Sequence, residues 1–351
     1  MEGGFRGSER AAGDCSGGKS DAVIRLEALM AQEPAAMAVA VHENGVLTGI
    51  ASPAAAGLSL DASSPMRSAS NTKTFVAATV LSMWEAGELD LDDPVGARAS
   101  APIADILRGG GYDLDRITIR HLLNHSAGLH DHADDSFLDL ILEEPDRRWT
   151  REEQALLCMT RGGPDTPAGT RYRYSDTGYI VLGDIIETRL GQPLASVVRQ
   201  RMDFDGLGLS STWWEAMEPA PDGVLLEGRQ FFRKRDVFHF DPTMDLYGGG
   251  GLVMSAADLA KAMAAIFEGR VFRREGTLSE MLKPGSHEGG ADYRLGVFAS
   301  GEGERRFFWH IGFWGSAAYY QPERRLSVAG YTSRRDDRSR LMQLIETGMM
   351  G

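Results

Sequence analysis

The distribution of strands and helices along the chain constrains its fold more than any other feature. Residues 35–42 read as a strand, Glu43-Asn44-Gly45 supplies a hairpin turn, and residues 46–51 return as a second strand. Further strands are predicted near the other end, at residues 294–298, 307–310, 317–321 and 326–332. We therefore predict an α+β fold in which both ends of the chain build one antiparallel β-sheet flanked by helices, with a mostly helical lobe inserted between them.

Apolar residues at helical spacing, with their start and stop signals, place the helices. They are predicted at residues 21–32, from 70 to about 87, and at 119–129, 152–159, 180–190, 256–267 and 334–349. Residues 212–240 have no clean period and are predicted as a long surface excursion. The predicted organisation is a disordered tail (1–20), a sheet domain (21–91 and 248–351) and a helical lobe (92–247), with a cleft between the lobes.

The composition is that of an ordinary globular protein and argues against several classes of partner. Of 351 residues, 42% are hydrophobic and 25% charged, and the net charge is −13. Nucleic-acid binding needs clustered Lys and Arg and is not expected. No apolar run reaches the ~18 residues that span a membrane, and no secretory signal is recognised. With only Cys15 and Cys158, we predict no structural disulfide and a cytoplasmic location. The sequence indicates no oligomeric state.

The segment Ser70-Asn71-Thr72-Lys73, at the start of an apolar helix, is the main candidate for chemistry. At ~1.5 Å rise per residue, Ser70 and Lys73 share one helical face about 5 Å apart. A serine hydroxyl is a weak nucleophile until a base takes its proton, and a lysine can be that base when its pKa is lowered. The helix start also offers unpaired N–H groups that suit an oxyanion. Taken alone, the segment equally fits a helix N-cap followed by a solvated lysine.

Two further segments complete a pattern. Tyr174-Ser175-Asp176 lies on a predicted loop of the helical lobe, and His310-Ile311-Gly312 lies on a predicted strand. In this order and spacing, the three segments resemble the motifs of the serine β-lactamase and penicillin-binding-protein superfamily. The chain looks most like its class C β-lactamase branch, with DD-peptidases, D-amino-acid amidases and family VIII carboxylesterases. Residues 119–129 and 250–261 resemble flanking segments of the same branch.

The resemblance implies a role for each matching residue. Ser70 would attack a carbonyl and become acylated, while Lys73 and Tyr174 share the proton transfers. His310 would complete the catalytic set, and the backbone N–H groups of Ser70 and Phe313 would form the oxyanion hole. A phenol titrates at about 10 in water, so we expect Tyr174 to need the positive charge of Lys73 to act near neutrality. The expected substrate-binding residues are Asp176, Gly312 and Trp314.

Two departures from the superfamily pattern bear on the substrate. Its β-lactamases usually carry Asn where this chain has Asp176, and a carboxylate cannot donate a hydrogen bond to a β-lactam amide carbonyl. They usually carry Lys where this chain has His310, and an imidazole is mostly neutral at physiological pH. Both departures lower the expected β-lactamase activity. They favour a neutral ester or an amine-bearing acyl compound.

We therefore expect a serine hydrolase that forms an acyl-enzyme and cleaves esters of small apolar acyl groups, with weak β-lactamase activity at most. Alternatives on the same fold are a D-amino-acid amidase or peptidase, and an acyltransferase of the peptide-cyclase kind. A non-catalytic ligand-binding relative is disfavoured because every acylation residue is present. The partner is a small-molecule ester or amide, and no cofactor is implied. The histidines between residues 121 and 132 fit no standard zinc spacing, so no metal site is predicted.

Overall fold

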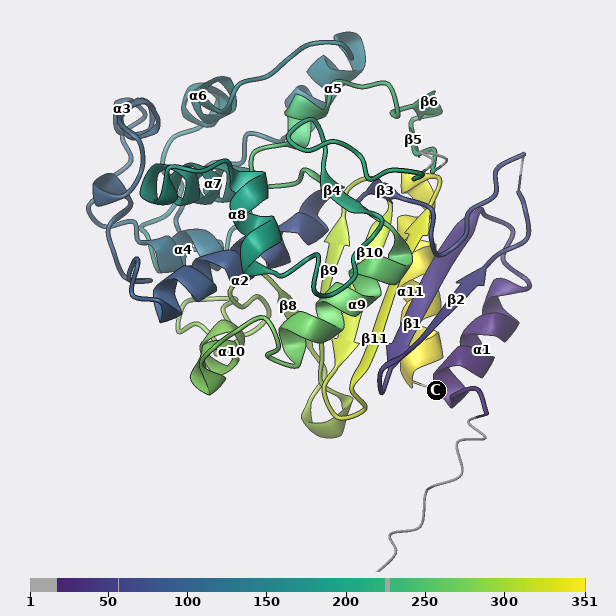
Figure 1. Cartoon of the computed structure of the whole chain (residues 1–351). Helices are drawn as coiled ribbons and strands as arrows, with labels where there is room; N and C mark the ends of the chain where they lie inside the picture. The colour runs from purple at the N-terminus through teal and green to yellow at the C-terminus, as the bar shows by residue number, and fades with distance from the viewer. Residues whose placement is uncertain (1–17, 56, 225–227, 351) are drawn as a thin grey trace, which may run out of the picture.

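The computed structural model describes residues 18–55, 57–224 and 228–350 (Figure 1). Its centre is a six-stranded antiparallel sheet with the strand order β2-β1-β11-β10-β9-β8. These strands are β1 (Met37–Glu43), β2 (Val46–Ala51), β8 (Phe298–Ser300), β9 (Phe307–Gly312), β10 (Ser316–Gln321) and β11 (Leu326–Thr332). The pairing of β1 with β11 joins the two ends of the chain, and the predicted α+β fold is confirmed.

The hairpin between β1 and β2 is the one read from the Asn-Gly dipeptide. Glu43 pairs with Val46, which leaves Asn44 and Gly45 as a two-residue turn with φ angles of 51° and 82°. Positive φ at both positions is the geometry that matches the twist of the flanking strands, and Asn and Gly tolerate it best.

Helices cover both faces of this sheet. Small side chains of β1, Ala38 and Ala40, face the cluster that contains α9 (Ala256–Phe267). The alternate residues Val39 and Val41 face a second cluster with α1 (Asp21–Met30) and α11 (Arg338–Met350). The strand is therefore apolar from Met37 to Val41, because each face buries its own residues.

Most of the remaining helices gather beyond the β8 edge of the sheet, at the left of Figure 1, while α5 lies at the top of that view. Helix α2 (Thr72–Glu85) is buried almost all round and contacts α7, α8 and α10. A helix that is apolar on every side belongs in a core, so α2 carries the residues after Ser70 into the interior. The others are α3 (Ala101–Gly109), α4 (Ile119–Leu123), α5 (Asp135–Glu143), α6 (Arg151–Arg161), α7 (Asp176–Leu190), α8 (Leu194–Arg201) and α10 (Glu275–Leu282).

Two predicted segments were wrong. Residues 294–297 form a turn around Gly296, whose φ is 82°, and only Phe298 enters a strand. Residues 212–240 are not wholly a surface excursion, because β4 (Thr212–Trp214) is buried and pairs with β7 (Leu252–Met254). A three-residue strand is too short to show a period, so its two tryptophans were the only sign of burial. Strand β7 also pairs with β3 (Met66–Arg67), and β5 (Phe231–Phe232) forms a small hairpin with β6 (Arg235–Asp236).

Several boundaries differ from the prediction. Helix α4 ends at Leu123 instead of reaching residue 129, because His125 and Gly128 adopt positive φ. Helix α7 begins at Asp176, four residues earlier than expected, and α11 begins four residues later, at Arg338. Of the predicted tail, residues 1–17 lie outside the described residues, while Ser20 caps α1. The six-stranded sheet uses only residues 37–51 and 298–332, and we retain the division into a sheet domain and a helical lobe as a proposal. In the described ranges, no helix has the length and apolarity to cross a bilayer.

Candidate active site

Ser70 lies in a short 3-10 turn (Ala69–Asn71) that leads into α2 and packs against β9. The residue before it, Ala69, has a φ of 46°, a region that costs a non-glycine residue free energy and that packing must maintain. The Asn71 side chain provides one such tie. In the orientation that satisfies its neighbours, its amide donates to the His310 carbonyl (3.0 Å) and accepts from the Gly312 N–H (3.2 Å). Ser70 is thereby fixed between the helical part of the molecule and the sheet.

The Ser70 hydroxyl is the meeting point of two predicted catalytic residues. Lys73 Nζ donates a hydrogen bond to Ser70 Oγ over 2.8 Å, and Tyr174 OH donates to the same oxygen over 2.9 Å. The lysine comes from the first turn of α2, and the tyrosine from the loop that precedes α7. The structure therefore brings together three residues that lie up to 104 positions apart in the chain.

Lys73 is fully buried, and each of its three N–H bonds has a partner. Besides Ser70, its Nζ donates to the Gly249 carbonyl over 2.7 Å and forms an ion pair with Asp176. An ammonium has three donors and no acceptor, so this set of partners uses all of them. Gly249, from the loop before β7, was not singled out from the sequence.

Tyr174 is held as a neutral phenol. Burial, and next the carboxylate of Asp176, raise the pKa of Tyr174 well above its ordinary value. The positive charge of Lys73 lies close by, with Nζ 5.2 Å from the centre of the Tyr174 ring, but burial and a carboxylate dominate the pKa of Tyr174. His125 positions the residue, because its ring lies 4.2 Å from the Tyr174 ring, centroid to centroid, and its Nδ1 accepts a hydrogen bond from the Ser175 N–H (3.2 Å).

The expected oxyanion donors are available. Within the described ranges, no backbone or side-chain acceptor binds the N–H of Ser70 or of Phe313. Phe313 follows Gly312, the last residue of β9. A Cβ added at Gly312 would collide with Ser316 Oγ and the Ser68 carbonyl. Glycine at position 312 thus permits the close approach of β9 to the Ser70 turn. Gly312 acts there through packing, and its expected contact with substrate stays a prediction.

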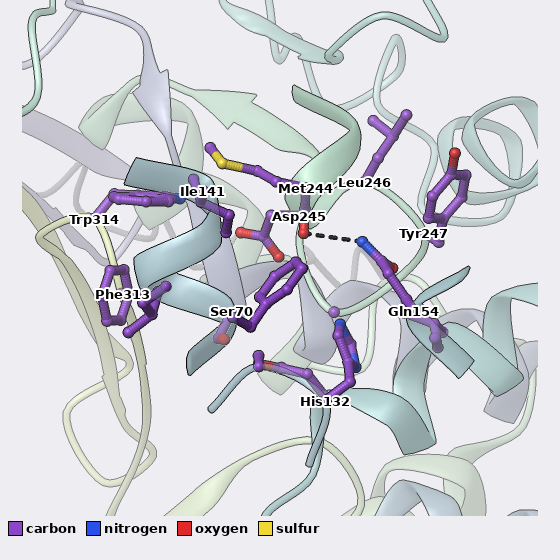
Figure 2. Close-up of a pocket in the computed structure, with 16 residues that line it drawn as sticks. Ser70, His132, Ile141, Gln154, Met244, Asp245, Leu246, Tyr247, Phe313 and Trp314 are labelled. Atoms are coloured by element: carbon purple, nitrogen blue, oxygen red, sulfur yellow. Dashed lines mark hydrogen bonds between the residues drawn. The ribbon is translucent and has the colours of Figure 1, made fainter. Parts of the chain in front are cut away.

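A pocket opens beside Ser70 (Figure 2). Asp176, Phe313 and Trp314 line it. Asp176 and Trp314 are two of the three residues that the sequence led us to expect in substrate binding. Its wall is mostly apolar, with contributions from α5, α7 and the segment before β7, namely Phe137, Leu138, Ile141, Ile180, Met244 and Leu246. A site of this kind suits a small organic acyl group.

A family model described as Beta-lactamase matches residues 25–345, nearly the whole chain. The chain belongs to the β-lactamase family. The superfamily predicted from the three motifs, that of β-lactamases and penicillin-binding proteins, is confirmed.

Curated relatives of this β-lactamase-family chain carry several names. It is 29% identical over 205 residues to a putative fimbrial assembly protein FimD, serogroup D, of Dichelobacter nodosus, which covers 58% of this chain and 49% of that protein. It is 30% identical over 225 residues to Esterase EstB of Burkholderia gladioli, covering 57% of this chain and 56% of the esterase. The chain thus spans about half the length of these curated relatives.

Among solved structures, a D-stereospecific amidohydrolase from Streptomyces sp. superimposes with a TM-score of 0.78 at 24% sequence identity. The match covers 94% of this chain and 98% of the other. At that identity the similarity shows the shared β-lactamase-like fold.

Asp176, one of the two departures from the β-lactamase pattern, changes the charge around Lys73. Its carboxylate pairs with Lys73, and its backbone N–H donates to Asp131 Oδ1 over 3.0 Å. Burial, and next the neighbouring Asp176, raise the pKa of Asp131 to about 7. The sequence analysis predicted neither the ion pair of Asp176 with Lys73 nor the second carboxyl group behind it.

His310, the other departure, lies behind the catalytic group. Its imidazole is buried, and its Nε2 lies 3.1 Å from the hydroxyl of Tyr293. Burial, and next the charge of Lys73, lower the pKa of His310 to about 3, so the ring is neutral, as the sequence indicated. Within the described part of the chain, no hydrogen bond joins the imidazole to Ser70, Lys73 or Tyr174. A direct catalytic role of His310 stays a prediction.

Because His310 stays neutral, His310→Gln is expected to leave the shape of the pH profile of kcat/KM unchanged across the neutral range. An ordinary histidine titrates at about 6.5, whereas the pKa of this one is lowered to about 3. The measurement is ester hydrolysis as a function of pH in the wild type and the variant. Loss of an inflection near neutrality in the variant would show that the imidazole titrates in the working enzyme.

Two histidines of the 121–132 segment have structural contacts. His121 completes the capping box of α4 with Thr118, and His125 supports Tyr174. Across the described ranges, no group of three or more His, Cys, Asp or Glu side chains is arranged to hold a metal ion.

Proposed function

We propose that this chain is a serine hydrolase that forms an acyl-enzyme on Ser70 and cleaves esters of small acyl groups. The observation that carries the proposal is the pair of hydrogen bonds received by Ser70 Oγ, from Lys73 Nζ and from Tyr174 OH. In the reaction, Oγ forms a bond to the carbonyl carbon, the hydroxyl proton passes to this pair, and the leaving group departs with a proton. Water then cleaves the acyl-enzyme and releases the acid.

The environment of Tyr174 supports its action as the proton donor to the leaving group. A phenol whose pKa is raised stays protonated at neutral pH and is ready to donate. Lys73 is then the partner that would accept the Ser70 proton, a step that requires its Nζ to have given up one proton first. The free N–H groups of Ser70 and Phe313 would stabilise the oxyanion of the tetrahedral intermediate.

The pocket supports a small apolar acyl group, because most of its wall is aliphatic or aromatic. Esters are favoured over β-lactams for two reasons. The Asp176 carboxylate cannot donate to a lactam amide carbonyl, and the neutral His310 supplies no charge for a carboxylate. An amidase or a peptidase would use the same acyl-enzyme, and an acyltransferase differs only in the nucleophile that accepts the acyl group.

Ser70→Ala is expected to abolish covalent labelling by a fluorophosphonate and to remove turnover of p-nitrophenyl butyrate. The wild type should take up one adduct and hydrolyse the butyrate well above its rate on nitrocefin. Intact-mass spectrometry and absorbance assays measure both results. An unlabelled wild type would overturn the proposal, as would labelling or turnover that persists without Ser70.

A further inference from the structure

The pocket beside Ser70 contains a carboxylate with no partner. Asp245 ends a short 3-10 turn (Pro242–Asp245), and its side chain lies against Gly250, where a Cβ would collide with it. Within the described ranges, no ion pair or hydrogen bond reaches this carboxylate. The indole N–H of Trp314 lowers the pKa of this carboxyl group but makes no hydrogen bond of standard geometry with it. Asp245 lines the pocket, as Figure 2 shows.

The two cations that act on Asp245 are both committed elsewhere. Lys73 uses its three N–H bonds on Ser70, Gly249 and Asp176. Arg67 binds the carboxylate of Glu215 and the carbonyl groups of residues 237 and 240. Arg67 thus uses four of its five N–H bonds on other groups, and within the described ranges neither cation forms a hydrogen bond or an ion pair with Asp245. The pocket therefore combines two carboxylates with a single buried lysine that only one of them contacts.

A second acceptor in the same pocket is also unpaired. Gln154 is 1% exposed, and its Nε2 donates to the carbonyl groups of Thr243 and Met244, each over 3.0 Å. These two bonds fix which end of the amide is the acceptor, and Gln154 Oε1 is buried without a donor. In Figure 2 the amide end of Gln154 points toward Met244 and Asp245. A buried acceptor without a donor is costly, and its partial negative charge favours a cation nearby.

His132, which also lines the pocket, lies beside Thr177. Thr177 Oγ1 accepts from the His132 backbone N–H (3.1 Å) and lies 2.9 Å from the His130 carbonyl and 3.1 Å from His132 Nδ1. When the Thr177 proton goes to the His130 carbonyl, the imidazole proton is on Nδ1 and Nε2 carries a lone pair. Burial lowers the pKa of His132 to about 4, which keeps the ring neutral. In that arrangement His132 Nε2 is an acceptor as well.

We propose that this pocket recognises a primary ammonium group in the acyl part of the substrate, which makes the acyl donor an amino-acyl ester or amide with an apolar side chain. An ammonium offers three donors and a positive charge, which match the Asp245 carboxylate and the acceptor at His132 Nε2. The apolar wall takes the side chain, while Ser70 faces the carbonyl. The inference rests on the proposed acyl-enzyme function and names its substrate class.

The charge on Asp245 fits this role. Burial, and next the nearby Asp176, raise the pKa of Asp245 to about 7 in the empty pocket. A bound ammonium would favour the charged form of this carboxyl group and offset the cost of holding it beside a second carboxylate. A neutral acyl group would leave the carboxylate desolvated and unpaired.

The test compares methyl esters that differ only in the amine: D- and L-phenylalanine methyl ester against 3-phenylpropionic acid methyl ester, at neutral pH. In the wild type, kcat/KM for one amino ester should exceed that for the amine-free ester by at least about tenfold, the value expected for a charge-assisted hydrogen bond. In Asp245→Asn that ratio should fall by about tenfold. The matched control is Asp139→Asn, which removes an exposed carboxylate of α5 that is paired with Arg233 and does not line the pocket, and should keep the wild-type ratio.

The outcomes separate this inference from the proposed function. Equal hydrolysis of all three esters, or an unchanged ratio in Asp245→Asn, would overturn the ammonium site while leaving the acyl-enzyme intact. If Ser70 is labelled but no ester turns over, calorimetric titration of Ser70→Ala with the same esters decides instead. Tighter binding of an amino ester would support the site, and equal or absent binding would overturn it. Absence of any Ser70 labelling would count against the acyl-enzyme itself.

Discussion

Replacing Lys73 by methionine is expected to lower kcat/KM for ester hydrolysis by about 10³-fold, within the range that a positioned acid or base contributes. The side chain lies 2.8 Å from the nucleophile, and no other base occupies its place. The same change should lower the free energy of unfolding by about 3 kcal/mol, because it leaves the Asp176 carboxylate without its ion-pair partner. Steady-state kinetics and chemical denaturation measure the two effects.

The double variant Lys73→Met/Asp176→Asn separates these effects. With the carboxylate also neutralised, most of the lost stability should return, because no unpaired charge remains. Activity should not return, because the proton acceptor for Ser70 is still missing. Asp176→Asn alone provides the reference for the cycle. If the double variant recovers substantial turnover, Lys73 serves mainly to neutralise Asp176 and is not the base.

The parts of the site that could be predicted from sequence are those set by local geometry or by the family pattern. The spacing of Ser70 and Lys73 on one helical face is a property of any helix, and the Asn44-Gly45 turn fixes its own hairpin. Tyr174 stands out only through its order relative to Ser70 in the family pattern, since no local signal distinguishes it from a core tyrosine.

Contacts between distant segments could not be predicted. The hydrogen bond from Lys73 to Gly249 joins residues 176 positions apart. The hydrogen bonds from Gln154 to residues 243 and 244 join residues about 90 positions apart. Nothing in the sequence around Asp245 marks it as a pocket residue, because its position depends on how the segment before β7 packs against α5 and α7. The direction of the Tyr174 pKa was likewise hidden, since burial decides it.

Replacing Tyr174 by phenylalanine is expected to slow hydrolysis by an amount that depends on the leaving group. If the phenol protonates the leaving group, ethyl butyrate should lose about 10²–10⁴-fold in kcat/KM, because ethoxide cannot leave without a proton. p-Nitrophenyl butyrate has the same acyl group, but p-nitrophenolate is stable without a proton, so its acylation should slow much less. Initial rates of the two esters, measured with the wild type and the variant, give this difference.

The matched control is Tyr172→Phe. Tyr172 belongs to the same aromatic cluster and its pKa is also raised by burial, but its hydroxyl makes no hydrogen bond to Ser70 in the described structure. Its removal should therefore spare both esters, so a loss seen only in Tyr174→Phe reports the bond to Ser70 Oγ. Equal losses on both esters in Tyr174→Phe would assign the tyrosine to the activation of Ser70 instead. A phenol with a raised pKa would then have to act as a base, against the direction in which its surroundings shift it.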